Sequence, residues 1–213
     1  MCPDQLRSRH ATDDDLPVLS ALMERAIAVL QRGFLDLRQI EASWAVMRVD
    51  RQLVRDRTYS VVERAGTIAG CGGWSRRATL FGGDHAGGRD PRWLTPGTDA
   101  ARIRAMYTDP AHARQGVGRL VLSLCERDAM QAAFTRAELA ATLSGEPLYR
   151  ACGYVVLDAF TAGDGVPLVR MGKPLRTWVR QPGVRQPGVR QPGISVPSCD
   201  QRIWKLPSRS VRR

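Results

Sequence analysis

Two glycines at the start of an amphipathic segment are the clearest chemical signal in this sequence. Gly116 and Gly118 follow a strand-like run and stand where the next helix is expected to begin, near Val117. The first turn of a helix leaves backbone N–H groups without partners and carries a partial positive charge. An anion can approach these N–H groups closely where side chains are missing, and Arg114 and Arg119 add positive charge. The pattern predicts a phosphate or pyrophosphate site.

Three known kinds of phosphate-binding loop can be compared with this stretch. A P-loop needs a Lys-Ser/Thr pair after its second glycine, and none follows Gly118. A dinucleotide-binding loop needs a third glycine where Val121 stands. The third kind is the acyl-CoA loop of the GCN5-related N-acetyltransferases (GNAT), with the pattern Q/R-x-x-G-x-G/A after a strand. The stretch "ARQGVG" (Ala113–Gly118) resembles this third pattern, although Ala113 replaces the usual Gln or Arg.

A second segment strengthens the resemblance to the GNAT family. After the glycine-bearing helix and one further strand, the family typically has the segment N-x-x-A-x-x-L-Y-x-x-x-G-F. At the same point this sequence has "TLSGEPLYRACGY" (Thr142–Tyr154), in which Leu148-Tyr149 and Gly153-Tyr154 match the pattern. Thr142 stands where Asn is common, and Gly145 stands where Ala is common. The opening "LRSRHATDDDLPVLSALM" is also similar to the family's first strand and helix. The resemblance covers about Leu6–Leu175.

The resemblance implies an acetyl-CoA-dependent N-acetyltransferase without a metal, in which an amine attacks the thioester directly within a ternary complex. Tyr149 would be the general acid that protonates the departing CoA thiolate. Main-chain groups of Met106 and Thr108 would bind the pantetheine arm or the acetyl carbonyl. The full set of residues expected at the cosubstrate is Met106, Tyr107, Thr108, Ala113, Arg114, Gln115, Gly116, Val117, Gly118, Arg119 and Thr142.

The general base is less clearly marked. Glu138, on the strand after the glycine-bearing helix, is the first candidate, and Glu63 is a second. For both, a solvated or ion-paired carboxylate is the competing interpretation. Cys152 lies close to Tyr149 in the sequence, but no histidine partner is evident, so we expect it in the core.

Helical and strand-like patterns alternate through the first 175 residues. Strands are expected in "LRSRHA", "TYSVVERAGTIAGCGGWS" (a hairpin turning at Arg64–Gly66), "ARIRAMYT", "RAELAAT", "YVVLDAF" and "VPLVRMGK". Helices are expected in "TDDDLPVLSALMERAIAVL" (with a Thr12/Asp15 capping box), "LRQIEASWAVMRV", the segment from Val117, and "EPLYRAC". The predicted fold is α/β (α+β mixed), a GNAT-like mixed, mostly antiparallel sheet of about six or seven strands flanked by about four helices.

The acceptor is expected to be a primary amine of a small molecule or peptide, and the sequence leaves open whether it is a small-molecule amine, an antibiotic, a peptide N-terminus or a protein lysine. The first two helices and the Gly/Pro-rich loop Thr79–Asp99 are the segments expected to select it. Aromatic and basic side chains there that could line a pocket are Trp74, Phe81, Arg92 and Trp93. For Trp74, a place in the core is the alternative.

The last part of the chain differs in composition from the rest. Three copies of VRQPG run from Val179 to Gly193, and their Pro and Gly residues disfavour helix and strand. Residues 176–213 carry +8 of the total charge of +11, which leaves +3 on residues 1–175. We therefore predict an acyl-CoA N-acyltransferase domain at 1–175 and a basic, disordered tail at 176–213. Without aromatic residues inside the repeat, a linker is favoured over a nucleic-acid-binding arm.

Apolar segments and cysteines in the sequence indicate in which cellular compartment the protein is expected. Hydrophobic residues make up 43% of the chain, but no apolar run approaches the roughly 20 residues that span a bilayer. The first residues lack the apolar stretch of a secretory signal, and five cysteines are scattered without a CxxC pair. We expect a cytoplasmic protein with free thiols and no membrane partner. A homodimer is one of the oligomeric states that the sequence leaves open.

Two alternatives to the enzyme stay open at this point. One is a binding protein that senses acyl-CoA without turnover, and the other is a nucleic-acid-binding protein that acts through the basic tail. Release of free CoA thiol with a panel of amines separates the first alternative from an enzyme. Strongly salt-dependent DNA affinity that disappears on truncation at Arg176 would identify the second.

Overall fold

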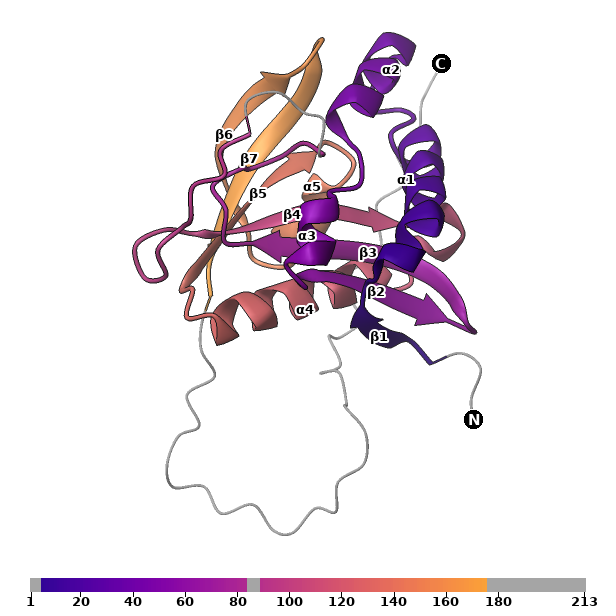
Figure 1. Ribbon diagram of the computed structural model, residues 1–213. Helices are drawn as coiled ribbons and strands as arrows, with labels where there is room; N and C mark the ends of the chain where they lie inside the picture. The colour runs from indigo at the N-terminus through magenta and orange to yellow at the C-terminus, as the bar shows by residue number, and fades with distance from the viewer. Residues whose placement is uncertain (1–4, 84–88, 176–213) are drawn as a thin grey trace, which may run out of the picture. The chain divides into compact units, whose positions relative to one another are not determined.

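A seven-stranded sheet forms the centre of the computed structural model, which describes residues 5–83 and 89–175 (Figure 1). The strands are β1 (Arg7–His10), β2 (Tyr59–Arg64), β3 (Thr67–Ser75), β4 (Ala101–Thr108), β5 (Arg136–Thr142), β6 (Val155–Ala162) and β7 (Val166–Pro174). Their order across the sheet is β1-β2-β3-β4-β5-β7-β6. Every neighbouring pair is antiparallel except β4 and β5, which are parallel. The predicted mixed, mostly antiparallel sheet is confirmed.

The described helices are α1 (Leu16–Leu30), α2 (Leu37–Val46), α3 (Arg51–Arg55), α4 (Val117–Gln131) and α5 (Glu146–Ala151), with short 3-10 turns at η1 (Asp13–Asp15) and η2 (Pro110–His112). Four of these helices were predicted, and α3 was not. Among the described helices, none combines the length and apolar character that crossing a membrane requires. The basic tail predicted at 176–213, with its repeats, lies outside the described residues.

Two apolar clusters lie on opposite faces of the sheet because side chains alternate along each strand. Val62 of β2 packs in the cluster that contains the buried stripe of α4, whereas Val61 packs in the cluster that contains Leu19 and Leu22 of α1. Helix α4 lies very close to β3: a Cβ at Gly72 would be 2.6 Å from the Val121 Cγ1. The glycine-rich sequence of β3 therefore sets how closely α4, which begins at the predicted anion site, approaches the sheet.

The N-terminus of the first helical segment is fixed by the predicted capping box. The Thr12 N–H donates to the Asp15 carboxylate at 2.8 Å, and Arg9 donates two hydrogen bonds to the same carboxylate at 2.7 and 2.8 Å. The Arg9 hydrogen bond, more than the opposing effect of burial, lowers the pKa of Asp15 to about 2. This cap joins β1 to the start of α1.

Replacing Asp15 with Asn should lower the free energy of unfolding by about 1 kcal/mol at neutral pH, because the partly exposed ion pair with Arg9 is lost and a neutral amide oxygen is a weaker acceptor than a carboxylate for the Thr12 N–H. A depressed carboxyl pKa stabilises the fold fully above the unfolded value of about 4, and this stabilisation decreases as pH falls toward the folded value. Urea unfolding of both proteins should show a difference that shrinks between about pH 5 and pH 3. A difference that stays constant over this range would contradict the assignment.

Candidate active site

A bulge interrupts β4 in the middle of the sheet. The register of β4 against β3 shifts between Cys71 and Gly73, so that Ala105 and Met106 together lie opposite the single residue Gly72. Ala105 has a φ of 51°, a left-handed conformation that costs about 1 kcal/mol for a residue with a Cβ. Bulges of this kind bend a strand and redirect its groups, and they are frequent at functional sites.

Beyond the bulge, β4 and β5 separate. The two strands pair in parallel at Ala101–Ile103 and Ala137–Leu139. Within the described sheet, residues 140–142 of β5 continue to pair with β7 alone, and residues 107–108 of β4 pair with β3 alone. Figure 1 shows β5, β7 and β6 turned steeply away from the direction of β2, β3 and β4. Main-chain groups of β4 around Met106 are therefore not used by β5, as the prediction for Met106 and Thr108 requires.

Asp109 fixes the loop that joins β4 to α4. Its N–H donates to the Ala69 carbonyl of β3 at 2.9 Å, and its carboxylate accepts from the Ala111 N–H at 2.9 Å. The same carboxylate forms an ion pair with Arg25 of α1 at 2.7 Å. Burial alone would raise the pKa of Asp109, but the hydrogen bonds from Arg25 and Ala111 lower it. A carbonyl of β3, an N–H of the loop itself and a side chain of α1 thus hold the loop in one conformation.

The mouth of α4 fits an anion. Gly116 is the N-cap residue with a φ of 84°, and a Cβ placed on it would have no neighbouring atom within 4 Å. The N–H of Leu120 donates to the Gly116 carbonyl at 3.0 Å. The N–H groups from Gly116 to Arg119 therefore precede the first intrahelical bond of the helix. An open space beside these donors is what a diphosphate requires.

The remaining predicted residues of the loop differ in their surroundings. Arg114 has a left-handed backbone with a φ of 62°, and Ala113 ends η2. Gln115 donates to the Ala111 carbonyl at 3.0 Å, and its side-chain oxygen accepts from Arg64. The Gln115 side chain is therefore engaged with the protein, and Val117 is buried under the helix. Backbone groups at Gly116 and Gly118 remain the main candidates for anion binding.

The two sequence motifs meet in space at Gly118. A Cβ on Gly118 would lie 3.0 Å from the Leu148 Cδ2 of α5 and 3.3 Å from the Thr108 Oγ1 at the end of β4. The glycine loop, the end of β4 and the Leu-Tyr segment are therefore in contact. This arrangement was predicted only indirectly, through the resemblance.

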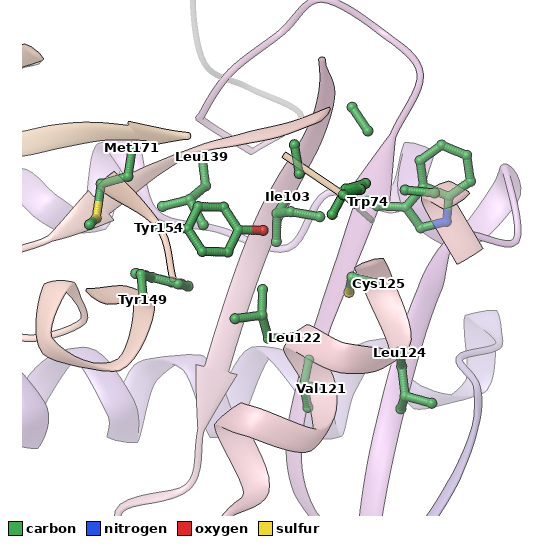
Figure 2. Close-up of a cluster of buried hydrophobic side chains, with 14 of the residues drawn as sticks. Trp74, Ile103, Val121, Leu122, Leu124, Cys125, Leu139, Tyr149, Tyr154 and Met171 are labelled. Atoms are coloured by element: carbon green, nitrogen blue, oxygen red, sulfur yellow. The ribbon is translucent and has the colours of Figure 1, made fainter. Parts of the chain in front are cut away.

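Tyr149 follows Leu148 and is 8% exposed in the core cluster beneath α4. Its ring lies edge-on to Tyr154, with centroids 5.9 Å apart, and Figure 2 shows the two rings beside Leu122. Burial, more than the neighbouring thiols of Cys125 and Cys152, raises the pKa of Tyr149 well above its usual value. Within the described residues, its hydroxyl makes no hydrogen bond. Tyr149 therefore keeps its proton at neutral pH, and no described residue accepts that proton.

Thr142 and Gly145 shape the turn that leads into α5. The Gly145 N–H donates to the Thr142 Oγ1 at 3.2 Å, and a Cβ on Gly145 would be 3.3 Å from the Tyr149 Cε2. Thr142 thus supports the turn, and the missing side chain at Gly145 lets the Tyr149 ring lie against it. Cys152 is half-buried and packs against the same core cluster.

The two candidate bases are both ion-paired and apart from Tyr149. Glu138 pairs with Arg102, at the end of β5 where β4 and β5 are still joined. Leu139 packs in the core cluster of Tyr149, so strand alternation places Glu138 on the opposite face of the sheet. Glu63 pairs with Arg9 at 2.9 Å near the β1 edge. The structure does not bring either carboxylate together with the tyrosine.

A cavity of about 540 Å³ lies between α1 and the segment from α2 to α3. Its walls are mainly apolar, with Glu24 as the acidic lining residue and Arg48 and Arg51 as the basic ones. The complete lining is Leu16, Pro17, Ser20, Met23, Glu24, Ile27, Trp44, Met47, Arg48, Val49 and Arg51. We refer to this cavity as the α1–α3 groove. Its volume and apolar walls are typical of a small-molecule site.

The side chains named as possible pocket residues near the loop Thr79–Asp99 lie in different surroundings. Trp74 is 4% exposed in the core, with its ring edge-on to Phe134, so the core alternative holds. Phe81 contacts Phe160 with centroids 5.3 Å apart, and Trp93 lies under Arg77. None of these aromatic residues lines the α1–α3 groove. The sequence missed residues 47–51 of the groove because their role depends on how a linker folds over α1.

Within the described part of the chain, no group of three or more His, Cys, Asp or Glu side chains is arranged to hold a metal ion. The free thiols there are Cys71, Cys125 and Cys152. The candidate functional groups described above are the backbone donors at the start of α4, a tyrosine with a raised pKa and, separately, an apolar groove.

Comparisons with solved structures give the same architecture. A GCN5-related N-acetyltransferase from Rhodopseudomonas palustris is 18% identical, covers 82% of this chain and 99% of its own, and superposes with a TM-score of 0.61. The paia N-acetyltransferase from Thermoplasma acidophilum, solved with coenzyme A, is 14% identical over 80% of this chain and 99% of its own, with a TM-score of 0.54. The protein yncA of Salmonella typhimurium, solved with its cofactor acetyl-CoA, is 17% identical over 82% of this chain and 96% of its own, with a TM-score of 0.51. At these identities the likeness establishes the fold.

The family itself is established from the sequence. No curated protein matches this chain. A family profile does match residues 20–154, which include the glycine loop, the bulged strand and the Leu-Tyr segment. This chain is a member of the acetyltransferase (GNAT) family.

Proposed function

We propose that this protein is an N-acetyltransferase that moves the acetyl group of acetyl-CoA to a primary amine by direct attack. The observation that supports this most strongly is the contact between the glycine loop, the end of β4 and α5 at Gly118, beside Tyr149. Family membership and neighbours solved with CoA or acetyl-CoA support the choice of cosubstrate. Acetyl-CoA would supply the activated acyl group.

Each part of the site has a step that it can perform. The N–H groups from Gly116 to Arg119 bind the diphosphate, which places the thioester along the separated edge of β4. A main-chain N–H near Met106 stabilises the negative charge that develops on the thioester oxygen as the amine attacks. Tyr149 gives its hydroxyl proton to the sulfur as the carbon–sulfur bond breaks. Holding both reactants in one site contributes to the rate by reducing the entropy cost of their encounter.

Glu138 remains our candidate for the base that takes the amine proton. Arg102 holds its carboxylate in an ion pair, so this pair would have to open before Glu138 could accept a proton. We therefore propose Glu138 as the base together with opening of its ion pair with Arg102.

The α1–α3 groove is our candidate for the acceptor site. Its lining from Leu16, Met23, Ile27 and Trp44 favours an amine carried on an apolar or aromatic body. The groove has one acidic lining residue, Glu24, and two basic ones, Arg48 and Arg51. This charge balance disfavours a highly cationic acceptor such as a polyamine.

Release of CoA thiol from acetyl-CoA tests the proposed activity. The full chain should release thiol in the presence of an amine panel that includes arylalkylamines, apolar-headed peptides and polyamines, with faster turnover for the apolar members. Tight acetyl-CoA binding without turnover across the panel would instead identify a sensor. Absence of both binding and turnover would reject the proposal.

Replacing Trp44 with Ala should raise the KM of the best acceptor by about tenfold or more, because a large apolar wall of the groove is removed. The Kd of CoA should stay within about twofold, because the diphosphate donors are on α4. Trp93→Ala is the matched control, since this tryptophan is 55% exposed and lies outside the groove. Equal effects of the two substitutions on KM would remove the groove from the acceptor site.

A further inference from the structure

A buried tyrosine on β2 reaches across the sheet to the bulge in β4. Tyr59 is 0% exposed, and its hydroxyl donates a hydrogen bond of 2.7 Å to the carbonyl of Ala105. Ala105 is the residue with a φ of 51° at the point where β4 leaves its regular register. The hydrogen bond therefore ends on the strained residue of the bulge.

The Tyr59 side chain crosses β3 at a glycine, which leaves space for its ring. Tyr59 pairs with Gly73 of β3, and β3 lies between β2 and β4. A Cβ on Gly73 would be 2.7 Å from the Tyr59 Cδ2 and 2.8 Å from the Thr58 carbonyl oxygen. Any side chain at Gly73 would block the ring from lying across β3. Gly73 thus leaves room for the Tyr59 ring, and the ring carries the hydroxyl to the Ala105 carbonyl.

The Tyr59 hydroxyl has two acceptors within reach. It donates to the Ala105 carbonyl oxygen at 2.7 Å and lies 3.3 Å from the Cys71 Sγ, a longer contact with a weaker acceptor. Burial raises the pKa of the Cys71 thiol to about 12, and burial also raises the pKa of Tyr59 well above its usual value. Both groups therefore stay protonated at neutral pH, and the tyrosine keeps a proton that it donates to the closer acceptor, the Ala105 carbonyl.

We propose that Tyr59 is a positioning residue for the acetyl transfer: its hydrogen bond holds Ala105 in the left-handed bulge and thereby directs the main-chain groups of Met106 toward the thioester. The role rests on the proposed function, because it acts on the strand edge that carries the developing negative charge. It requires no contact between Tyr59 and either reactant.

The test uses Tyr59→Phe, which removes the hydroxyl and keeps the ring. We expect kcat to fall by about tenfold, with the KM of the acceptor and the Kd of CoA within about twofold of wild type, because the diphosphate donors are on α4. Val61→Ala is the matched control: Val61 is a fully buried residue on the same strand and in the same cluster, and its loss lowers stability without removing the hydrogen bond. An equal fall of kcat in Val61→Ala would overturn the proposal.

A second substitution separates positioning from general stability. Glycine adopts a positive φ without strain, so Ala105→Gly should hold the bulge without help from the hydroxyl. The double variant Tyr59→Phe/Ala105→Gly is expected to recover kcat to within about threefold of Ala105→Gly alone. A double variant as slow as Tyr59→Phe would contradict the proposal, since a defect elsewhere in the core would not be repaired at Ala105.

A readout that does not depend on turnover keeps this test separate from the proposed function. Backbone amide NMR of the full chain should show the signals of Ala105–Tyr107 shifted in Tyr59→Phe and restored toward the Ala105→Gly positions in the double variant. These shifts are expected even if no amine is acetylated, in which case the enzymatic assignment fails and the conformational role stands. Unchanged signals at Ala105–Tyr107 in Tyr59→Phe would overturn the proposal.

Discussion

Replacing Tyr149 with Phe should lower kcat by about a hundredfold while leaving the Kd of CoA within about twofold of wild type. Removal of a general acid costs about this much, because the thiolate then leaves without a proton. The ring packs in the core cluster that contains the buried stripe of α4, edge-on to Tyr154, and is kept in the variant, so the fold should be retained. Steady-state kinetics at saturating acetyl-CoA, with calorimetry for CoA, measure both quantities.

Tyr154→Phe is the control for this experiment. Its hydroxyl is buried, and its ring lies edge-on to Tyr149, as Figure 2 shows. We expect Tyr154→Phe to keep kcat within about threefold of wild type. An unchanged kcat in Tyr149→Phe, or equal losses in both variants, would reject the role of Tyr149 as the acid.

The pH dependence of kcat gives a further check on the same residue. Because burial raises the pKa of Tyr149 well above its usual value, the hydroxyl stays protonated as pH rises through the ordinary tyrosine value of about 10. The wild-type kcat should therefore show no decline from tyrosine ionisation up to about pH 10.

Replacing Gly118 with Leu should weaken CoA binding by about a hundredfold or more. The added side chain would start 3.0 Å from the Leu148 Cδ2 and 3.3 Å from the Thr108 Oγ1, and would fill the mouth of α4 where the diphosphate is expected. Calorimetric titration with CoA measures the loss. Ser123→Leu adds the same side chain to an exposed position of the same helix and should leave the Kd within about twofold.

Gly116→Ala addresses the possibility that Gly118→Leu displaces α5. A Cβ on Gly116 would meet no atom within 4 Å, but the φ of 84° is strained for alanine, so the N–H groups should shift. Gly97→Ala carries a similar strain, with a φ of 83°, outside the loop. CoA affinity close to wild type in both Gly118→Leu and Gly116→Ala would remove the glycine loop from the cosubstrate site.

The parts of this fold that local patterns determine were predicted closely. Strands β4 and β5 have the predicted bounds, Ala101–Thr108 and Arg136–Thr142, because alternating apolar residues and flanking turn residues are local signals. The Thr12/Asp15 capping box is a short-range hydrogen-bond pattern and is present. The glycine loop and Tyr149 could be proposed from the sequence for the same reason, since each lies in a contiguous motif.

The parts that depend on long-range contacts were not predicted. Helix α3 is only five residues long, and Asp50 caps it while also forming a buried ion pair of 2.6 Å with Arg104 of β4. No local pattern specifies such a pair. The hydrogen bond from Tyr59 to Ala105 joins residues 46 positions apart and depends on a glycine in a third strand. The ion pair of Glu138 with Arg102 likewise depends on strand pairing.

A crystal structure of the full chain with bound CoA tests the central claim most directly. We predict that the diphosphate accepts hydrogen bonds from the N–H groups between Gly116 and Arg119, with the sulfur between the separated ends of β4 and β5 and within hydrogen-bond reach of the Tyr149 hydroxyl. CoA bound elsewhere, or with its sulfur on the far side of α5 from Tyr149, would contradict the account.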